Sequence, residues 1–272
     1  MTNATIRPYL PELLKIAKQA GQEIMAVYAT ADIGETSKAD NSPLTLADLA
    51  SHQTIVKGLT KLTPDIPVLS EEAADFPFEE RKQWSRFWLV DPLDGTKEFI
   101  KRNGEFTVNI ALIENGKPLL GVVYAPVLDT CYYGAEGQGA HVQRGNENPE
   151  AISAKQHKAG TAMKIVASRS HSDARTQAML DGLGEHECIS MGSSLKLCLV
   201  AEGKAHFYPR LGPTMEWDTA AAHAVVNAAG GEVHERSGVD LHYNKADLHN
   251  PEFFVHVRND ERLRTMIKEF KQ

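Results

Sequence analysis

Acidic side chains gather in three short segments of the sequence. Ser70-Glu71-Glu72 follows one short apolar run, Asp91-Pro92-Leu93-Asp94-Gly95-Thr96 follows the next, and Glu216-Trp217-Asp218 precedes an alanine-rich stretch. Oxygen ligands of this kind suit Mg²⁺ or Mn²⁺, which prefer carboxylates, carbonyls and water. A buried strand that ends in several carboxylates is costly unless cations neutralise them, and two divalent cations would cancel roughly four negative charges. The acidic segments therefore predict a site for divalent cations.

The segment from Asp91 to Thr96 has the residue types that a metal and phosphate site needs. Pro92 fixes its own φ angle and has no N–H, so the turn is rigid and the Leu93 carbonyl is free to point at a metal. Gly95 permits a tight turn, after which Thr96 can begin a short helix whose free N–H groups would face a phosphate. The alternative for this segment is an ordinary surface turn. For Asp218 the alternative is the N-cap of a helix, with Trp217 packed in the core.

Several other kinds of catalytic site are absent from the sequence. The Gly-Lys pairs at Gly116 and Gly203 are followed by Pro and Ala, so neither completes a P-loop. There is no HExxH motif and no GxSxG nucleophile elbow, and the 11 histidines show no tight ligand spacing. The cysteines form no CxxC pair, which argues against a disulfide framework and a thiolate zinc site. The three cysteines are Cys131, Cys188 and Cys198.

Composition limits the class of protein. The 29 Lys and Arg residues against 36 Asp and Glu residues give a net charge of −7, which argues against a nucleic-acid partner because such a protein needs a basic surface. The hydrophobic fraction of 42% is that of an ordinary globular chain, and 272 residues allow one large or two medium domains. The first residues lack a secretory signal, and the longest apolar run, residues 119–128, is about half of the ~20 residues that a membrane span needs. We expect a cytoplasmic protein.

The elements that must position the acidic segments follow from hydrophobic periodicity. Apolar residues at intervals of three and four predict helices over residues 10–27 and 46–62. Short apolar runs at 67–69 and 86–91 are typical of buried strands. If these strands are neighbours, their ends bring the acidic side chains to one edge of a sheet.

Turn signals divide the rest of the chain. Asn115-Gly116 predicts a hairpin between strands at 106–113 and 118–124, and a second hairpin is expected near 136–139. The polar stretch at 143–160 is the best candidate for a junction between two halves.

Beyond the junction, predicted strands alternate with predicted helices. The strands are expected at 164–168, 186–190 and 206–208, and the helices at 174–183, 194–202 and 219–229. The pattern predicts an N-terminal α+β half, residues 1–155, and a C-terminal α/β half, residues 156–272.

The acidic motifs resemble those of a known family. Asp91-Pro92-Leu93-Asp94-Gly95-Thr96 and Trp217-Asp218-Thr219-Ala220-Ala221, preceded by Ser70-Glu71-Glu72, are similar to the signatures of the inositol monophosphatase superfamily of Mg²⁺-dependent, lithium-sensitive phosphatases. The resemblance covers almost the whole chain. It implies a layered α-β-α-β-α sandwich, as in the sugar phosphatases, with the metals between its two halves.

Within the superfamily, the chain looks like the 3'(2'),5'-bisphosphate nucleotidases of the bacterial CysQ type. Lys97-Glu98-Phe99 stands where inositol monophosphatases usually carry Thr-Asn-Phe. Residues 40–48 are similar to that branch's D-x-S-P-V-T-x-A-D, with Leu44 as a departure. Further matches to the branch are Tyr208-Pro209-Arg210, Gly212-Pro213-Thr214 and Tyr243-Asn244-Lys245.

The resemblance implies a set of metal ligands and catalytic residues. Glu71, Asp91 and the Leu93 carbonyl would bind one Mg²⁺, and Asp91, Asp94 and Asp218 would bind the second. Mn²⁺ in place of Mg²⁺, and a third cation, stay open. Thr96, paired with Asp48, would orient or deprotonate the attacking water, and Glu71 completes the expected catalytic set. The alternatives are that Thr96 is only an N-cap and Asp48 a surface acid of the second helix.

The resemblance also implies a nucleotide pocket. The Gly95 and Thr96 amides would hold the departing phosphate, beside Glu71, Leu93, Asp94 and Asp218 at the metals. Positions that contact substrate in related nucleotidases correspond to Ser168, His171, Gly192 and Lys196. His171 would stack on or hydrogen-bond the adenine, Lys196 would pair with the second phosphate, and Arg210 is another phosphate partner. A solvated helix face is the alternative for Lys196.

The implied reaction is Mg²⁺-dependent hydrolysis of the 3'-phosphate of adenosine 3',5'-bisphosphate to AMP and phosphate, a step in sulfur metabolism. The sulfated nucleotide, which would give adenylyl sulfate, is a further substrate to consider. The alternatives are an inositol-1-phosphate or fructose-1,6-bisphosphate phosphatase, and a non-catalytic metal or nucleotide sensor. We infer a small nucleotide as the binding partner and no stable protein partner, and peripheral association with the inner membrane stays open.

Overall fold

The computed structural model describes residues 7–37, 43–168 and 174–270 of the chain. The helical elements are η2 (Arg7–Tyr9), α1 (Leu10–Tyr28), α2 (Leu46–Leu62), α3 (Phe78–Arg81), α4 (Thr96–Ile100), α5 (Ala174–Asp181), α6 (Leu195–Ala201), α7 (Glu216–Ala228) and α8 (Glu261–Glu269). The strands are β1 (Thr36–Ser37), β2 (Pro43–Leu44), β3 (Val68–Ser70), β4 (Arg86–Asp94), β5 (Thr107–Glu114), β6 (Lys117–Ala125), β7 (Thr130–Ala135), β8 (Gly139–Arg144), β9 (Glu150–Ile152), β10 (Met163–Ser168), β11 (His186–Met191), β12 (Phe207–Arg210), β13 (Gly231–Glu235) and β14 (Phe253–Val257).

The larger sheet has seven strands in the order β3-β4-β5-β6-β7-β8-β9. β3 and β4 are parallel, and the other neighbouring pairs are antiparallel. The hairpin predicted at Asn115 and Gly116 is confirmed, and both residues have the positive φ angles, 50° and 75°, that a two-residue turn between twisted strands requires. The second predicted hairpin is confirmed between β7 and β8.

The smaller sheet has five strands in the order β11-β10-β12-β14-β13. β10 lies parallel to both β11 and β12, and helix α5 makes the crossover between β10 and β11. β14 pairs antiparallel with β12 and β13. The strands β13 and β14 and the helix α8 are not among the elements predicted from the sequence.

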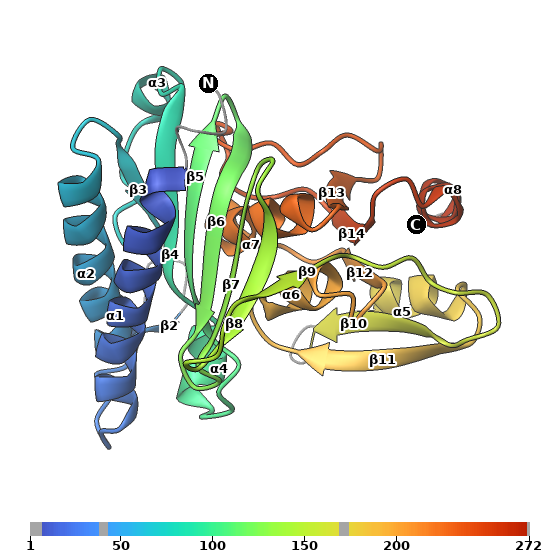
Figure 1. The fold of residues 1–272 in the computed structure, drawn as a ribbon, viewed down its shortest axis with the longest axis horizontal. Helices are drawn as coiled ribbons and strands as arrows, with labels where there is room; N and C mark the ends of the chain where they lie inside the picture. Colours follow the sequence, from blue (N-terminus) through green and yellow to red (C-terminus); the bar gives the residue numbers. More distant parts are fainter. Residues whose placement is uncertain (1–6, 38–42, 169–173, 271–272) are drawn as a thin grey trace.

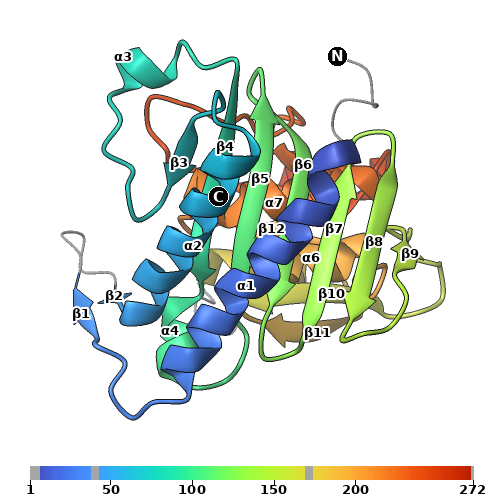
Figure 2. The ribbon, with the colours of Figure 1, turned by 60° about the vertical axis from the view of Figure 1, so that its left-hand side comes forward.

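Three hydrophobic cores hold five layers together (Figure 1). α1 and α2 cover one face of the larger sheet, and α6 and α7 lie between the two sheets. α5 and α8 cover the outer face of the smaller sheet. Figure 2 shows α1 and α2 crossing the larger sheet side by side. The predicted α-β-α-β-α sandwich is confirmed.

Element boundaries depart from the sequence prediction at two functional segments. The strand predicted at 86–91 continues to Asp94, and the helix predicted at 219–229 begins at Glu216. The predicted boundary at residue 155 falls between the last strand of the larger sheet and the first strand of the smaller one. A division into halves 1–155 and 156–272 stays a prediction, because α6 and α7 from the second half pack between the sheets of both.

Two glycines let α7 lie unusually close to the larger sheet. A Cβ atom at Gly121 on β6 would lie 2.0 Å from the carbonyl oxygen of Ala221, and one at Gly134 on β7 would lie 2.8 Å from the Cβ of Ala228. Real Cβ atoms do not approach other atoms so closely, so only glycine fits at Gly121 with the helix in this place.

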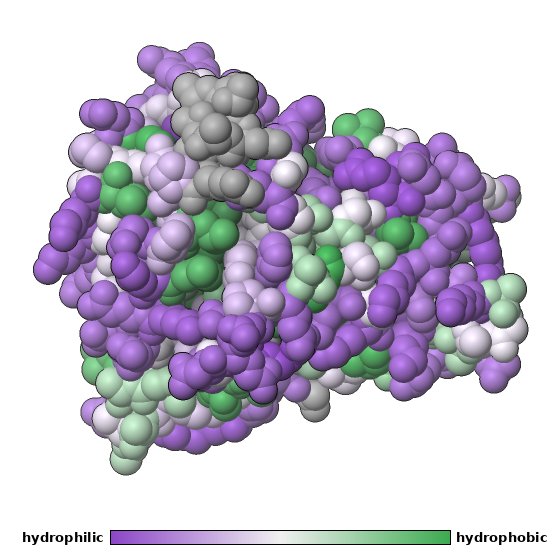
Figure 3. Space-filling model, in the orientation of Figure 1, coloured by the Kyte–Doolittle hydropathy of each residue, from purple (hydrophilic) through white to green (hydrophobic). Residues whose placement is uncertain are grey.

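The surface shown in Figure 3 is mostly hydrophilic, with hydrophobic residues in small separate groups. Such scattered apolar residues are ordinary for a folded domain. Within the described ranges, no helix combines the length and the apolar character that a membrane span requires.

Candidate active site

Strands β3 and β4 deliver the first two carboxylates. The parallel register pairs Ser70 with Val90, and the amide of Glu71 donates a hydrogen bond of 3.0 Å to the Val90 carbonyl. The carboxylate of Glu71 lies against that of Asp91, the next residue of β4. The prediction that two neighbouring strand ends bring these acids together is therefore confirmed.

The end of β4 is irregular, and this irregularity turns two aspartates into one site. The register with β5 shifts between Asp91 and Asp94. The amide of Leu93 donates to the Asp91 carboxylate at 3.0 Å, which fixes that side chain. Gly95 follows with a φ of 95°, a left-handed conformation that suits glycine, and α4 begins at Thr96 as expected.

Helix α7 supplies the third aspartate, and the alternative for this residue, a helix N-cap, is wrong. Asp218 is not the N-cap. It is the third residue of the helix, because the helix begins at Glu216 after the N-cap Met215. The Asp218 carboxylate accepts a hydrogen bond of 2.8 Å from the Met215 amide. That hydrogen bond uses only one carboxylate oxygen of Asp218, Oδ2. The neighbouring Trp217 packs in the core between the sheets, as the sequence analysis considered.

The three aspartates form one acidic centre. Asp91, Asp94 and Asp218 each place an oxygen within 4.8 Å of the other two. Burial raises the pKa of Asp91 well above its usual range, and the charges of Glu71, Asp94 and Asp218 raise it further. Burial also raises the pKa of Asp218, and it raises that of Asp94 to about 6 although Lys196 opposes the shift. The converging oxygens and the mutual repulsion fit a divalent cation, which would replace repulsion by attraction.

Asp48 and Thr96 meet at the edge of this centre. The Thr96 hydroxyl donates to Asp48 Oδ1 at 3.3 Å. The second oxygen of Asp48 accepts hydrogen bonds from the amide and hydroxyl of Thr45, the N-cap of α2, so the carboxylate is held by the helix start. Asp48 is only 1% exposed, so the alternative of a surface acid is wrong.

A loop before α6 forms the opposite wall. Ser194 donates from its amide to Asp94 at 2.5 Å, and its hydroxyl donates to Asn109 at 2.8 Å. The preceding residue, Ser193, has a φ of 46° and accepts a hydrogen bond of 2.6 Å from the Lys196 ammonium. Gly192 donates from its amide to the Glu105 side chain at 2.8 Å. These contacts tie the second half of the chain to β4 and β5 at the acidic centre.

Lys196 faces the acidic centre from this wall. It is buried, so the alternative of a solvated helix face is wrong. Burial lowers the pKa of its ammonium to about 8, and the charge of Asp94 works in the opposite direction. Its ammonium also lies 5.9 Å from the centre of the Tyr208 ring.

These groups line one cleft of about 370 Å³. Its lining includes Glu71, Asp94, Asp218, Lys196 and Arg210. In the described part of the chain, two buried polar atoms at this cleft have no hydrogen-bond partner, Arg210 Nε and Ser193 Oγ. Unpaired buried polar atoms are costly, and both of these atoms are donors of the kind that an anion accepts from.

Two predicted substrate contacts cannot be placed. His171, and the side chain of Ser168, lie outside the residues that the structure describes, as do Asp40, Asn41 and Ser42 of the motif at 40–48. Gly192, Gly95 and Thr96 do lie at the cleft.

The sequence analysis missed the residues that hold the carboxylates in place. Ser51, which donates to the Pro92 carbonyl, and Asn109, which donates to Asp94 at 3.4 Å, belong to no motif. Ser51 could have been suspected, because it lies three residues after Asp48 on the same face of a helix.

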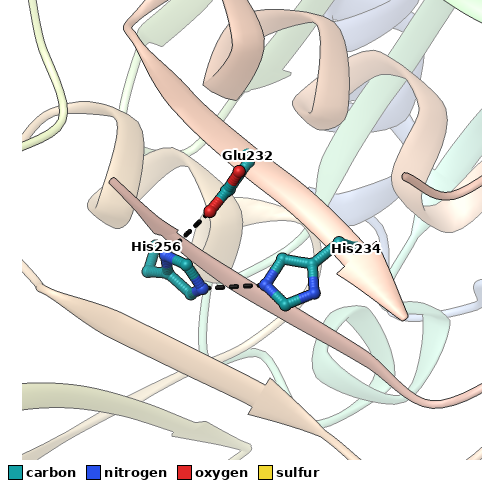
Figure 4. Close-up of side chains that lie close together, drawn as sticks. All are labelled: Glu232, His234 and His256. Carbon is teal, nitrogen blue, oxygen red and sulfur yellow. Dashed lines mark hydrogen bonds and ion pairs between the residues drawn. The ribbon is translucent and has the colours of Figure 1, made fainter. Parts of the chain in front are cut away.

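A second group of metal-binding residue types lies apart from the cleft, between β13, β14 and α8. Figure 4 shows His234 and His256 facing each other, with 2.8 Å between their Nε2 atoms, and His256 Nδ1 lying 3.4 Å from Glu232. All three side chains are buried. Arg264 of α8 donates to both oxygens of Glu232. We interpret this group as an internal polar network that fixes α8.

The family membership follows from comparison with known proteins. The model of the inositol monophosphatase family matches residues 6–271. The chain belongs to this family, whose members depend on metal ions.

Within the family, the chain is similar to bacterial nucleotidases. It is 54% identical over 251 residues to the 3'(2'),5'-bisphosphate nucleotidase CysQ of Escherichia coli K12, covering 91% of this chain and 99% of that protein. The crystal structure of CysQ from Bacteroides thetaiotaomicron superposes with a TM-score of 0.83 at 43% identity, covering 95% of this chain and all of that one. An IMPase of Thermotoga maritima shares the fold, with a TM-score of 0.79 at 24% identity over 97% of this chain and 98% of that one.

Proposed function

We propose that this protein hydrolyses the 3'-phosphate of adenosine 3',5'-bisphosphate to give AMP and phosphate. One observation carries the proposal: the acidic centre shares its cleft with two basic groups, Lys196 and Arg210, on the opposite wall. A substrate with one phosphate needs only the acidic centre and its cations. A second phosphate explains a buried ammonium and an unpaired guanidinium nitrogen in the same cleft. The similarity to the nucleotidases of Escherichia coli and Bacteroides thetaiotaomicron supports this substrate class.

Mg²⁺ is the proposed cofactor, held by oxygen ligands alone. Glu71, Asp91 and the Leu93 carbonyl would hold one ion, and Asp91, Asp94 and Asp218 the other. When bound, such ions supply Lewis acidity, which draws charge from the phosphoryl oxygens and lowers the pKa of a coordinated water. The observation that supports this assignment is geometric: oxygens of Asp91, Asp94 and Asp218 lie within 4.8 Å of one another. Burial raises the pKa of all three groups, so a divalent cation would stabilise their charged forms.

Asp48 and Thr96 would manage the proton of the attacking water. The Thr96 hydroxyl already donates to Asp48, so its own lone pairs are free to accept a proton from water while Asp48 receives the hydroxyl proton. Asp48 cannot swing away, since its other oxygen is bound at the start of α2. The pair thereby orients the water and removes its proton without large movement.

The rest of the substrate would lie toward Lys196. The Gly95 and Thr96 amides would hold the phosphate that is removed, while Lys196 and Arg210 would hold the second phosphate. Contacts of Ser168, His171 and Gly192 with the nucleoside stay predictions, as do the cytoplasmic location and the use of the sulfated nucleotide.

The test is phosphate release from adenosine 3',5'-bisphosphate, inositol 1-phosphate and fructose 1,6-bisphosphate, with Mg²⁺ and with chelator. We expect Mg²⁺-dependent release with the highest kcat/KM for the nucleotide, and Lys196→Met should raise KM for the nucleotide much more than for inositol 1-phosphate. A higher kcat/KM for inositol 1-phosphate or fructose 1,6-bisphosphate would show that the proposed substrate is wrong, while the proposed metal-dependent hydrolysis would stand. If no phosphate is released from any of the three compounds, the proposal that the protein is a phosphatase is wrong, and a non-catalytic sensor is favoured.

A further inference from the structure

One face of helix α2 contacts three segments that surround the acidic centre, at Thr96, Ser70 and Pro92. Asp48, Ser51 and His52 lie one turn apart on this face. Asp48 accepts from Thr96, and His52 Nδ1 lies 2.8 Å from the Ser70 hydroxyl, next to Glu71. Ser51 makes the third contact.

The hydroxyl of Ser51 donates to the Pro92 carbonyl at 2.7 Å. That carbonyl belongs to the same peptide unit as the amide of Leu93, which donates to the Asp91 carboxylate at 3.0 Å. A peptide unit is planar, so its C=O and N–H directions are fixed relative to each other. The plane between Pro92 and Leu93 is therefore held at both ends, by a hydroxyl on α2 and by the aspartate that it orients.

Pro92 makes this contact more important. A proline has no N–H, so residue 92 cannot donate to the neighbouring strand β5 and contributes only its carbonyl. The pairing of β4 with β5 is also interrupted between Asp91 and Asp94. Ladder hydrogen bonds thus fix this peptide less than the rest of β4, and Ser51 supplies a contact from the opposite side.

We propose that Ser51 is a positioning residue that orients the carboxylate of Asp91 through the peptide between Pro92 and Leu93, and so sets the affinity for the cation. The inference rests on the proposed function, in which Asp91 would be a ligand of both cations. Hydrogen bonds of this outer kind orient the ligands that touch the metal, and their removal typically lowers metal affinity about 10- to 100-fold.

The test is binding of Mn²⁺ alone, measured by electron paramagnetic resonance on the full-length protein. Ser51→Ala removes the donor, and Ser51→Cys keeps the side-chain size with a much weaker donor. We expect both variants to bind Mn²⁺ about tenfold more weakly than the wild type. The Mg²⁺ concentration for half-maximal activity should rise in the same proportion, while kcat at saturating Mg²⁺ changes little.

Thr63→Val is the matched control. The Thr63 hydroxyl is a buried hydrogen-bonding group at the other end of α2, where it accepts from Trp88 of β4 at 2.8 Å. Its removal should lower the unfolding midpoint and leave Mn²⁺ affinity unchanged. Unchanged affinity in both Ser51 variants would overturn the role of Ser51, provided that Asp91→Asn abolishes binding. If Asp91→Asn binds Mn²⁺ like the wild type, the metal centre itself is wrong. A loss in Ser51→Ala but not in Ser51→Cys would show that packing, not the hydrogen bond, is responsible.

Discussion

Removing one charge from the acidic centre should stabilise the protein when no metal is present. Asp94→Asn keeps the size of the side chain, and its amide oxygen can still accept the hydrogen bond from the Ser194 amide. The variant loses only the negative charge, which burial and, to a smaller degree, the charge of Glu71 disfavour. The same change should abolish phosphate release, because the charge is what a cation needs.

The expected gain follows from the pKa of Asp94, which burial raises from 3.8 to about 6. Each pKa unit corresponds to about 1.4 kcal/mol, so an ionised Asp94 costs the folded state about 3 kcal/mol at pH 8. The folded state holds its proton more tightly than the unfolded chain does. The cost is therefore complete above pH 6, shrinks as the pH falls from 6 to 4, and is absent below that range. Asp94→Asn should gain up to about 3 kcal/mol at pH 8 and almost nothing at pH 4.

Urea unfolding at pH 8 in chelator and in saturating Mg²⁺ measures both halves of this argument. In chelator the variant should have the higher midpoint, and in Mg²⁺ the wild type should gain while the variant gains much less. Asp65→Asn, at an exposed position after α2, is the control and should change neither midpoint. A variant that is less stable than the wild type in chelator, or that gains as much from Mg²⁺, would refute the reasoning.

Two further predictions concern Lys196 and Arg264. The Lys196 ammonium has a pKa of about 8 and loses its charge above that pH, so kcat/KM for the bisphosphate should fall as the pH rises through about 8. Lys196→Arg should move this fall to higher pH, because a guanidinium stays charged. A pH profile that does not move would contradict the role of Lys196 in phosphate binding. Arg264→Met should lower the free energy of unfolding by about 3–5 kcal/mol, because it leaves the buried Glu232 carboxylate without its guanidinium partner. Adding Glu232→Gln to this variant should recover much of the lost stability. Urea unfolding that shows no recovery would contradict the buried-pair explanation.

The sequence predicted the acidic centre and many of the elements that position it well, because both depend on local patterns, whereas the five-layer arrangement was expected only from the resemblance to a known family. Periodic apolar residues define α1 and α2, and the turn at Asn115 and Gly116 defines a hairpin. The ends of β3 and β4 could be placed together because both strands are short, apolar and followed by acids.

What the sequence did not predict depends on contacts between distant segments. The exact start of α7 is set by Asp218 bonding back to Met215, which makes the aspartate part of the helix and not its N-cap. The burial of Lys196 follows from the packing of α6 between the two sheets, which periodicity over seven residues cannot reveal. The role of Ser51 depends on a hydrogen bond to Pro92, 41 residues away, and its place on the same helix face as Asp48 does not identify that partner.

The close contact of Gly121 with the backbone of α7 sets the distance between this helix and the larger sheet, and both carry aspartates of the acidic centre. Asp218 lies on α7 and Asp91 on β4 of that sheet, so the gap between their carboxylates depends on how closely the helix lies on the strands. A side chain at residue 121 would push the helix away, since its Cβ would lie 2.0 Å from the Ala221 carbonyl. Mg²⁺ binds oxygen at about 2.1 Å and Ca²⁺ at about 2.4 Å, so a small change in this gap is enough to alter which ion fits. We therefore expect a residue that contacts none of the proposed ligands to influence the ionic radius that the centre accepts, and substitution at this position to change the cation preference with every ligand retained.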